Sequence, residues 1–356
     1  MKNFKTFFLI GLTLCVLPVL CSCDTHNPKN SFKFSGKTST ISETAEAVYI
    51  YSLTPSSDVK KQKNFIGCYD KSGNKYWEHK MEFSGDVYPL KDGRFFFANQ
   101  DGQIAAYDPN GQKLWEKKLD ITTDSNSYYL LNSHEELMVN LHSSPNNITE
   151  YLIININGDT KTSSPINATS TYTYNYPKGG YITEGYVDYN WSISKIRADF
   201  TLEWVYHANE NEDNIQICDI SKDGQILFSG TKGNDLFLKQ LNEEGAVLNS
   251  ADFQASNVQA KYFQDHIIAA ADTIMLLNEN LSIIKQGGDV KFPRIKVCGD
   301  SAFIYSIGSY SSSSSVVYDG YCIEFDANLR LLSEKTFKQT DRFIGVSDNG
   351  VAYYKK

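Results

Sequence analysis

The chain has 356 residues, of which 34 are lysine or arginine and 42 are aspartate or glutamate, so its formal net charge is −8. Aromatic residues make up 13% and charged residues 21% of the chain, which is too aromatic and too weakly charged for a disordered protein. The acidic balance, with no run of basic residues, argues against nucleic acid as a partner. We therefore expect a folded protein that binds no nucleic acid.

Residues 1–22 have the form of a lipoprotein signal peptide. Two lysines precede an apolar stretch from Phe7 to Leu20, which is too short for a stable membrane span and is interrupted by Pro18. The following Leu20-Cys21-Ser22-Cys23 resembles the bacterial lipobox. That resemblance implies cleavage before Cys23 and acylation of this residue, including palmitate. The alternative is an ordinary cleaved signal peptide whose cysteines are incidental.

Residues 23–45 are rich in Ser, Thr, Asn and Lys and show almost no apolar periodicity. This composition is typical of a flexible tether. Two or three acyl chains would anchor the protein stably to a membrane. We therefore expect a protein of the bacterial outer membrane, held by its lipid, with the periplasmic and the exterior side both left open.

Residues 46–356 contain short alternating apolar runs broken by Asp-Gly and Asn-Gly turns, which is the pattern of an all-β chain. A hairpin recurs at a mean interval of about 43 residues, and a four-stranded unit at this interval is typical of a β-propeller. The hairpins open at Asp70, Asp108, Asn155, Arg197, Asn242, Asn278 and Asp326. The sequence thus predicts one domain, a seven-bladed β-propeller of four-stranded blades.

Two of these hairpins carry a finer motif. Residues 106–115 read AYDPNGQKLW, and residues 68–77 match this pattern except for the alanine. The pattern resembles the tryptophan-docking motif of the PQQ-like, or quinoprotein-type, propellers. It predicts that Trp77, Trp115 and Trp204 are mostly buried between adjacent blades. At the same position the later units have Asn249, Lys285 and Ser333.

The resemblance to the PQQ-like propellers does not extend to their cofactor. Quinoprotein dehydrogenases hold it with a disulfide of adjacent cysteines, and no Cys-Cys pair occurs here. We therefore expect no cofactor. In leader, length and docking motif the chain is similar to the propeller lipoproteins of the outer-membrane β-barrel assembly machinery. This implies a non-enzymatic binding or assembly module whose partner is an envelope protein or a glycan.

No other motif predicts a metal site. Residues 209–214 resemble the start of a calcium loop, but Ile220 stands where a bidentate glutamate is needed, so we expect a plain acidic connection. The remaining cysteines lie in apolar runs without C-x-x-C spacing, which favours small buried residues over a disulfide or metal role. These are Cys68, Cys218, Cys298 and Cys322.

The ligand-binding candidates are aromatic residues in long loops between the second and third strands of a blade. Exposed Tyr and Trp beside Ser and Asn suit sugar stacking or a protein hot spot, although these residues could equally lie on the blades. The candidates are Tyr186, Tyr189, Trp191, Tyr310 and Tyr318.

The alternative function is a carbohydrate-active enzyme, a glycosidase or lyase, with no linear motif of its own. Its carboxylates would stand at the channel mouth, where the first strand of each blade begins. The candidates are Asp86, Asp213, Asp289 and Asp341.

The chain ends are expected to close the ring. The last residues, from 341 to 356, have the strand, turn, strand form of half a unit. We predict that residues 343–347 form the inner strand of the blade that contains Trp77, so that N- and C-terminal strands pair. One strand is then surplus, either 351–354 or 47–53.

Overall fold

The computed structural model describes residues 31–34, 37–53, 63–120, 128–143, 148–166, 169–188, 190–255, 258–290, 293–306, 320–337, 343–346 and 352–355. The predicted leader and several predicted site residues lie outside these ranges. They are Cys23, Tyr189, Tyr310, Tyr318 and Asp341.

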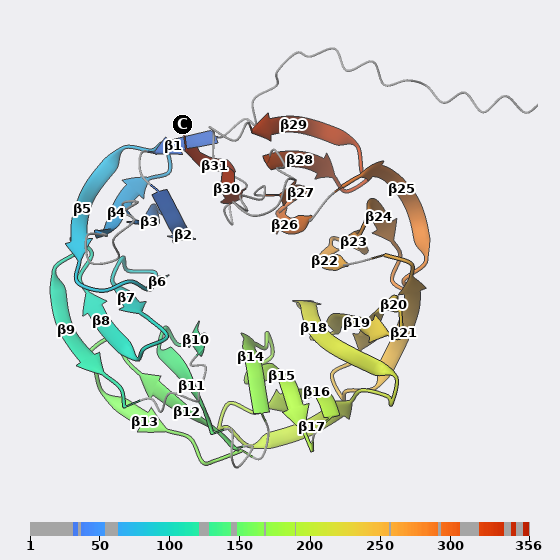
Figure 1. Ribbon diagram of the computed structural model, residues 1–356, viewed down its shortest axis with the longest axis horizontal. Coiled ribbons are helices and arrows are strands. Elements are labelled where there is room, and N and C mark those ends of the chain that lie inside the picture. The colour runs from blue at the N-terminus through green and yellow to red at the C-terminus, as the bar shows by residue number, and fades with distance from the viewer. Residues whose placement is uncertain are drawn as a thin grey trace, which may run out of the picture.

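Seven four-stranded antiparallel sheets stand as blades around a central channel (Figure 1). The first and second blades are β2 (Lys37–Glu43), β3 (Ala47–Leu53), β4 (Asn64–Asp70) and β5 (Lys75–Met81), then β6 (Asp86–Pro89), β7 (Phe95–Ala98), β8 (Gln103–Tyr107) and β9 (Lys113–Lys118). The third and fourth are β10 (Tyr128–Leu131), β11 (Leu137–Ser143), β12 (Ile148–Ile154) and β13 (Thr160–Thr162), then β14 (Thr169–Asn175), β15 (Tyr181–Val187), β16 (Asn190–Ile196) and β17 (Leu202–His207). The fifth, sixth and seventh are β18 (Glu212–Ile220), β19 (Ile226–Lys232), β20 (Asp235–Leu241) and β21 (Val247–Phe253), then β22 (Gln259–Phe263), β23 (His266–Ala270), β24 (Thr273–Leu277) and β25 (Ile283–Asp289), and finally β26 (Arg294–Cys298), β27 (Ser301–Ser306), β28 (Gly320–Asp326) and β29 (Leu331–Phe337). The predicted all-β propeller with seven four-stranded blades is confirmed.

The two chain ends meet in a further sheet of three strands, which we call the closing sheet. It consists of β30 (Phe343–Val346), β31 (Ala352–Lys355) and β1 (Ser31–Phe34), in the order β1-β31-β30. β31 pairs antiparallel with β30, and β1 pairs with β31 in parallel. The closing sheet lies between the first and seventh blades (Figure 1), so N- and C-terminal strands pair as predicted.

The details of this closure differ from the prediction. The inner strand of the Trp77 blade is β2, not the segment that begins at Phe343, because Lys37–Glu43 pairs with Ala47–Leu53 along its whole length. β1 and β2 both fall in the range predicted as tether, so the boundary at residue 45 was placed too late. The strand predicted to be surplus is accounted for by the closing sheet.

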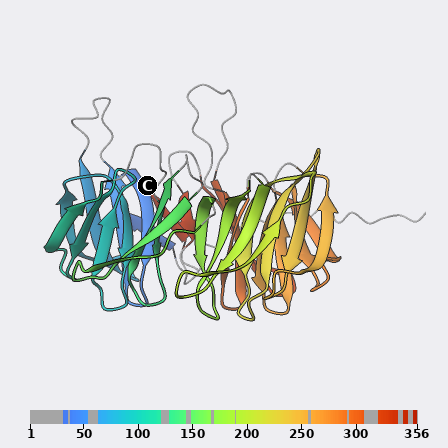
Figure 2. The same ribbon diagram turned by 90° about the horizontal axis from the view of Figure 1, so that it is seen from below.

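The alternating strand directions give the disc two distinct faces (Figure 2). The upper face carries the connections between second and third strands and those between blades, such as residues 233–234 and 208–211. The lower face carries the turns between first and second and between third and fourth strands, such as residues 221–225 and 242–246. This division decides which side chains can share a site.

The hairpins between third and fourth strands share one turn geometry. In the second blade the Asp108 carboxylate accepts hydrogen bonds from the backbone N–H groups of Asn110 and Gln112, at 2.9 and 2.8 Å. Gly111 follows with a φ of 77°, a left-handed conformation that glycine tolerates best. A carboxylate or amide at the opening position fixes six of the seven turns in this way, and in the hairpin that opens at Arg197 the Asp199 carboxylate accepts from the Thr201 N–H instead.

Each of the three predicted docking tryptophans donates its indole N–H to the turn of the next blade. The acceptor is the carbonyl oxygen one residue after the turn opens: Pro109 for Trp77 at 2.8 Å, Ile156 for Trp115 at 2.8 Å, and Glu243 for Trp204 at 2.7 Å. Most of the surface of each tryptophan is buried against a core cluster at the joint, in keeping with the prediction. At each such joint the left-handed turn residue is a glycine whose added Cβ would lie within 3.3 Å of the preceding blade's side chains; these are Gly111, Gly158 and Gly245.

After the third, fifth and sixth blades, which lack the tryptophan, the next turn supplies the bulk instead. Phe200, Leu281 and Leu329 occupy the glycine position with φ of 66°, 62° and 53° and pack against the preceding blade. The hydrogen bond is also retained at two of these joints, because Asn249 Nδ2 donates to the Glu279 carbonyl at 3.0 Å and Lys285 Nζ to the Asn328 carbonyl at 2.9 Å. The motif that fades along the sequence is therefore compensated in space.

Candidate functional site

An aromatic pair stands on the upper face of the fourth blade. Tyr186 and Trp191 are cross-strand neighbours at the β15–β16 hairpin, and their ring centroids lie 4.3 Å apart. Tyr186 is 38% exposed, and Trp191 is half-buried. Burial, followed by the nearby Asp213 carboxylate, raises the pKa of Tyr186. The pair is therefore a preformed aromatic surface next to the fifth blade.

A hollow of about 640 Å³ opens on the same face at the start of the fifth blade. Its wall combines carboxylates, amides, a hydroxyl and a lysine, all groups that can hydrogen-bond a polar ligand. Its lining residues are Glu210, Asn211, Glu212, Asp213, Asn214, Thr231, Lys232 and Gly233. We call this hollow and the Tyr186–Trp191 pair together the upper site.

One carboxylate of the upper site is already neutralised by the protein. The Lys239 ammonium contacts Glu212 Oε1, and the Tyr206 hydroxyl donates to Glu212 Oε2 at 3.1 Å. Asn209 Nδ2 donates to Glu212 Oε1 at 2.8 Å. Although burial opposes it, these hydrogen bonds hold the pKa of Glu212 below its ordinary value. Glu212 therefore fixes the connection between the two blades, while the exposed Glu210 and Asp213 remain at the hollow.

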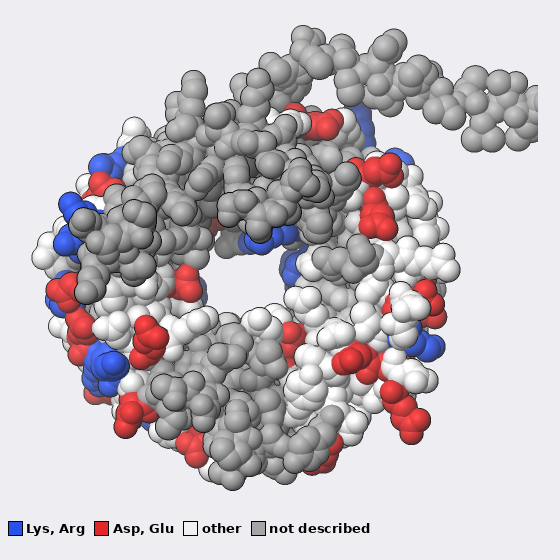
Figure 3. Space-filling view, viewed as in Figure 1, with Lys and Arg blue, Asp and Glu red and all other residues white. Residues whose placement is uncertain are grey.

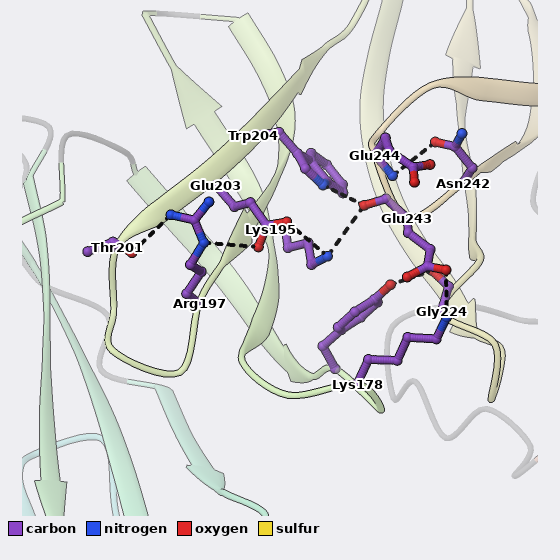
Figure 4. A network of polar contacts seen from close by, with 11 residues as sticks. Lys178, Lys195, Arg197, Thr201, Glu203, Trp204, Gly224, Asn242, Glu243 and Glu244 are labelled. Carbon is purple, nitrogen blue, oxygen red and sulfur yellow. Dashed lines mark hydrogen bonds and ion pairs between the residues drawn. The ribbon is translucent and has the colours of Figure 1, made fainter.

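A second polar network joins the same two blades on the lower face (Figure 4). Lys195 Nζ lies 3.2 Å from Glu203 Oε1 and 4.6 Å from the centre of the Tyr176 ring. The Tyr176 hydroxyl donates to the Gly224 carbonyl at 3.0 Å, and Lys178 pairs with Glu243 at 2.5 Å. Together with Trp204, these contacts hold the fourth and fifth blades in one relative position, which fixes the shape of the upper site above them.

A smaller cavity of about 250 Å³ lies between the inner strands of the second, third and fourth blades. It is lined by tyrosines and amides with one carboxylate. These residues are Asp86, Tyr88, Ala98, Asn99, Gln100, Tyr129, Leu130, Met138, Asn140, Tyr172 and Thr173. Figure 3 shows that the channel beside it is open and bordered by side chains of both charges.

A buried carboxyl lies at the joint between the fourth and fifth blades. Glu184 on β15 is 2% exposed; it accepts hydrogen bonds from the Ile217 backbone N–H, at an irregularity in β18, and from the Tyr174 hydroxyl. Burial raises its pKa from 4.5 to about 7. Glu184 therefore changes charge near neutral pH inside the joint between the fourth and fifth blades.

We expect this charge change to make stability depend on pH. Because the pKa of Glu184 is raised in the folded state, its stabilising contribution is complete below about pH 4.5 and is lost as the pH rises through about 7. The difference amounts to about 3 kcal/mol. Glu184→Gln should flatten this part of the profile and be more stable than the wild type at alkaline pH. Denaturant melts across this range measure the effect, and parallel profiles for both proteins would contradict it.

The structure brings together only some of the predicted site residues. Tyr186, Trp191 and Asp213 converge on the upper site, whereas Asp86 lines the small cavity on the other side of the fourth blade. Asp289 was wrongly placed at the channel mouth, because it ends β25, the outermost strand of the sixth blade. No sequence motif predicts the hollow, and its one signal is the Asn/Glu-rich segment that follows the aromatic hairpin.

The remaining chemistry is sparse in the part of the chain that the structure describes. Within it, no three His, Cys, Asp or Glu side chains form a group able to hold a metal ion. None of Cys68, Cys218, Cys298 and Cys322 forms a disulfide, and all but Cys298 are buried. Among the same residues no helix has the length and apolar character of a membrane span.

Comparisons with known proteins yield structural relatives alone. No family model and no curated protein matches the chain. Among solved structures it is similar to BamB from Moraxella catarrhalis, with 13% identity and a TM-score of 0.57 over 89% of this chain and 95% of that one. It is also similar to the Dos1 propeller (11% identity, TM-score 0.57, 90% and 91%) and to KlAtg21 in complex with the coiled coil of AgAtg16 (11%, 0.52, 85% and 100%). At these identities the likeness defines the fold, a β-propeller; the PQQ-like assignment stays a prediction.

Proposed function

We propose that the protein is a non-enzymatic binding module of the bacterial envelope, anchored to the outer membrane by a lipid on Cys23. The observation that carries this proposal is the upper site, where the partly exposed Tyr186–Trp191 pair stands near Asp213 of an open polar hollow. Aromatic rings next to hydrogen-bonding groups suit recognition better than catalysis, since no water-excluding pocket surrounds them. The similarity to BamB supports a propeller in such a role but does not identify its partner.

The chemistry of the upper site favours a neutral glycan over an envelope protein as the ligand. Sugar rings stack on Tyr and Trp, and their hydroxyls donate to carboxylates and accept from amides. The exposed Glu210 and Asp213 would repel acidic sugars, and Lys232 offsets only one of these charges. The enzyme alternative has less support, because its described candidates are apart: Asp86 is the one carboxylate among the lining residues of the small cavity, and Asp213 lies at the open hollow.

The test is binding of the purified protein to an array of neutral and acidic glycans, followed by substitution of the aromatic pair. Trp191→Ala should weaken binding roughly thirty-fold, the effect of losing a hot-spot side chain worth about 2 kcal/mol. Tyr76→Ala, which removes a 63% exposed tyrosine far from the site, is the control and should leave binding unchanged. Equal binding by all three proteins, or capture of an envelope protein but no glycan, would overturn the glycan assignment.

The anchor has its own test. Mass spectrometry of the protein from membranes should find lipid on Cys23 at the mature N-terminus, and Cys23→Ser should accumulate without acylation. A free N-terminus at Asp24 would contradict the anchor while leaving the glycan assignment untouched.

A further inference from the structure

An aliphatic surface runs along the lower rim of the fifth, sixth and seventh blades. Each of their outermost strands begins with two large aliphatic residues that are 44–53% exposed. They are Val247 and Leu248 on β21, Ile283 and Ile284 on β25, and Leu331 and Leu332 on β29. These three strands follow one another along the outside of the ring (Figure 1), and we call their six exposed residues together the aliphatic rim.

The backbone turns these residues outward. Opposite each pair the ladder shifts register by one residue, so that Leu248, Ile284 and Leu332 are the extra residues of β-bulges. A bulge bends its strand and re-aims the side chain it carries. Because the feature repeats on three neighbouring blades, the exposure belongs to the fold.

The rest of the rim is different in chemistry. The outermost strands of the first four blades each carry an ion-paired residue at the corresponding level. These pairs are Lys75–Glu78, Lys113–Glu116, Lys161–Glu136 and Lys195–Glu203. Three of these four strands expose one large apolar side chain at this level, Tyr76, Leu114 or Leu202, beside the charged residue, whereas each strand of the aliphatic rim exposes two. The fifth to seventh blades are therefore the most apolar sector of the rim and the one for which removal from water is most favourable.

The start of β1 indicates what covers the aliphatic rim. β30 follows the upper end of β29 and β31 runs antiparallel to it, so β31 and the parallel β1 both begin at the lower edge; Ser31 therefore lies at the lower edge of the closing sheet, between the seventh and first blades. Ser31 is eight positions after Cys23 in the sequence. Even a fully extended chain of that length spans at most about 28 Å. A lipid on Cys23 would hold this edge of the disc close to the bilayer.

We propose that the aliphatic rim rests on the lipid bilayer, so that the upper site faces away from the membrane. This inference depends on the proposed lipid anchor. Exposed aliphatic side chains at a membrane surface reach about 5–10 Å into the boundary between headgroups and acyl chains. The lower turns of the fifth and sixth blades carry Glu243, Glu244 and Glu279, so the attraction is apolar and anionic lipids are not required.

The experiment uses the full acylated protein in phosphatidylethanolamine vesicles that contain nitroxide-labelled headgroups. A fluorescent thiol label is placed at Ile284→Cys, at Leu114→Cys, which is the matching bulge residue of the second blade, and at Asp235→Cys on the upper face. The labelled wild-type protein gives the background from native thiols. We expect the probe at position 284 to be quenched several-fold more strongly than the other two, at low and at high salt.

Each contrary result has its own signature. Equal quenching at positions 284 and 114 on vesicle-bound protein would overturn the orientation but not the anchor. A spectral shift at 284 that grows with protein density and shows no nitroxide quenching would assign the aliphatic rim to a second copy of the chain. Protein that lacks lipid on Cys23 and does not bind vesicles would overturn both the anchor and the orientation, and would leave the glycan assignment standing.

Discussion

Replacing Trp115 by alanine is expected to lower the free energy of unfolding by about 3 kcal/mol, the lower end of the range for a tryptophan packed between elements. The substitution removes the hydrogen bond to the Ile156 carbonyl and the edge-to-face contact with Phe96, whose centroid is 6.1 Å away. It also leaves a cavity beside Gly158, which has no side chain to fill it. Denaturant melts measure the loss.

The neighbouring Leu114 is the matched control for this experiment. It is 50% exposed at the bulge of the same strand, so Leu114→Ala should change stability by no more than about 0.5 kcal/mol. A loss below about 1 kcal/mol for Trp115→Ala would mean that this joint does not depend on the indole. A complementary pair, Asn249→Trp alone and with Leu281→Gly, should show a large coupling, because tryptophan and the 2% exposed Leu281 compete for one space.

Deletion of residues 341–356 should lower the melting temperature by roughly 10 °C, which corresponds to about 4 kcal/mol or more for a chain of this size. It removes β30 and β31 and leaves β1 without its partner strand. Val346, buried against Phe303 and Phe337 of the seventh blade, is lost with them. The newly exposed strand edges should also promote aggregation.

A point substitution separates packing from the loss of strands. Val346→Ser keeps the closing sheet but puts a hydroxyl into its apolar contact, so it should cost about 1–3 kcal/mol. A deletion that melts within about 2 °C of the full chain would show that the ring is stable without the closing sheet.

The repeat could be predicted from the sequence because its signal is local. An aspartate or asparagine followed three residues later by glycine, as at Asp108 and Gly111, fixes a turn wherever it occurs. The compensation at Leu281 and Leu329 could not be predicted, since each of these side chains fills the space left by a missing tryptophan in the preceding repeat. No local rule connects two residues in different blades.

The first strand of the ring was missed for a different physical reason. Lys37–Glu43 is rich in Ser and Thr, and so is β14, the inner strand of the fourth blade. Inner strands border a water-filled channel, so they need little of the apolar alternation by which half-buried strands are recognised. The hollow of the upper site was likewise not evident, because its wall combines the fourth and fifth blades' connection with the tip of the β19–β20 hairpin.

The two kinds of joint between blades bear on how such a chain avoids misassembly. Tandem units of similar sequence can pair with the wrong neighbour while they fold. Here a blade with tryptophan on its outermost strand, such as the fourth, cannot pack against a next blade whose left-handed turn residue is leucine, because both side chains would occupy the same volume. A blade that lacks the tryptophan would leave a void against glycine. The two kinds of joint therefore restrict which blades can pack next to each other. Duplication or exchange of blades should be tolerated only between joints of the same kind.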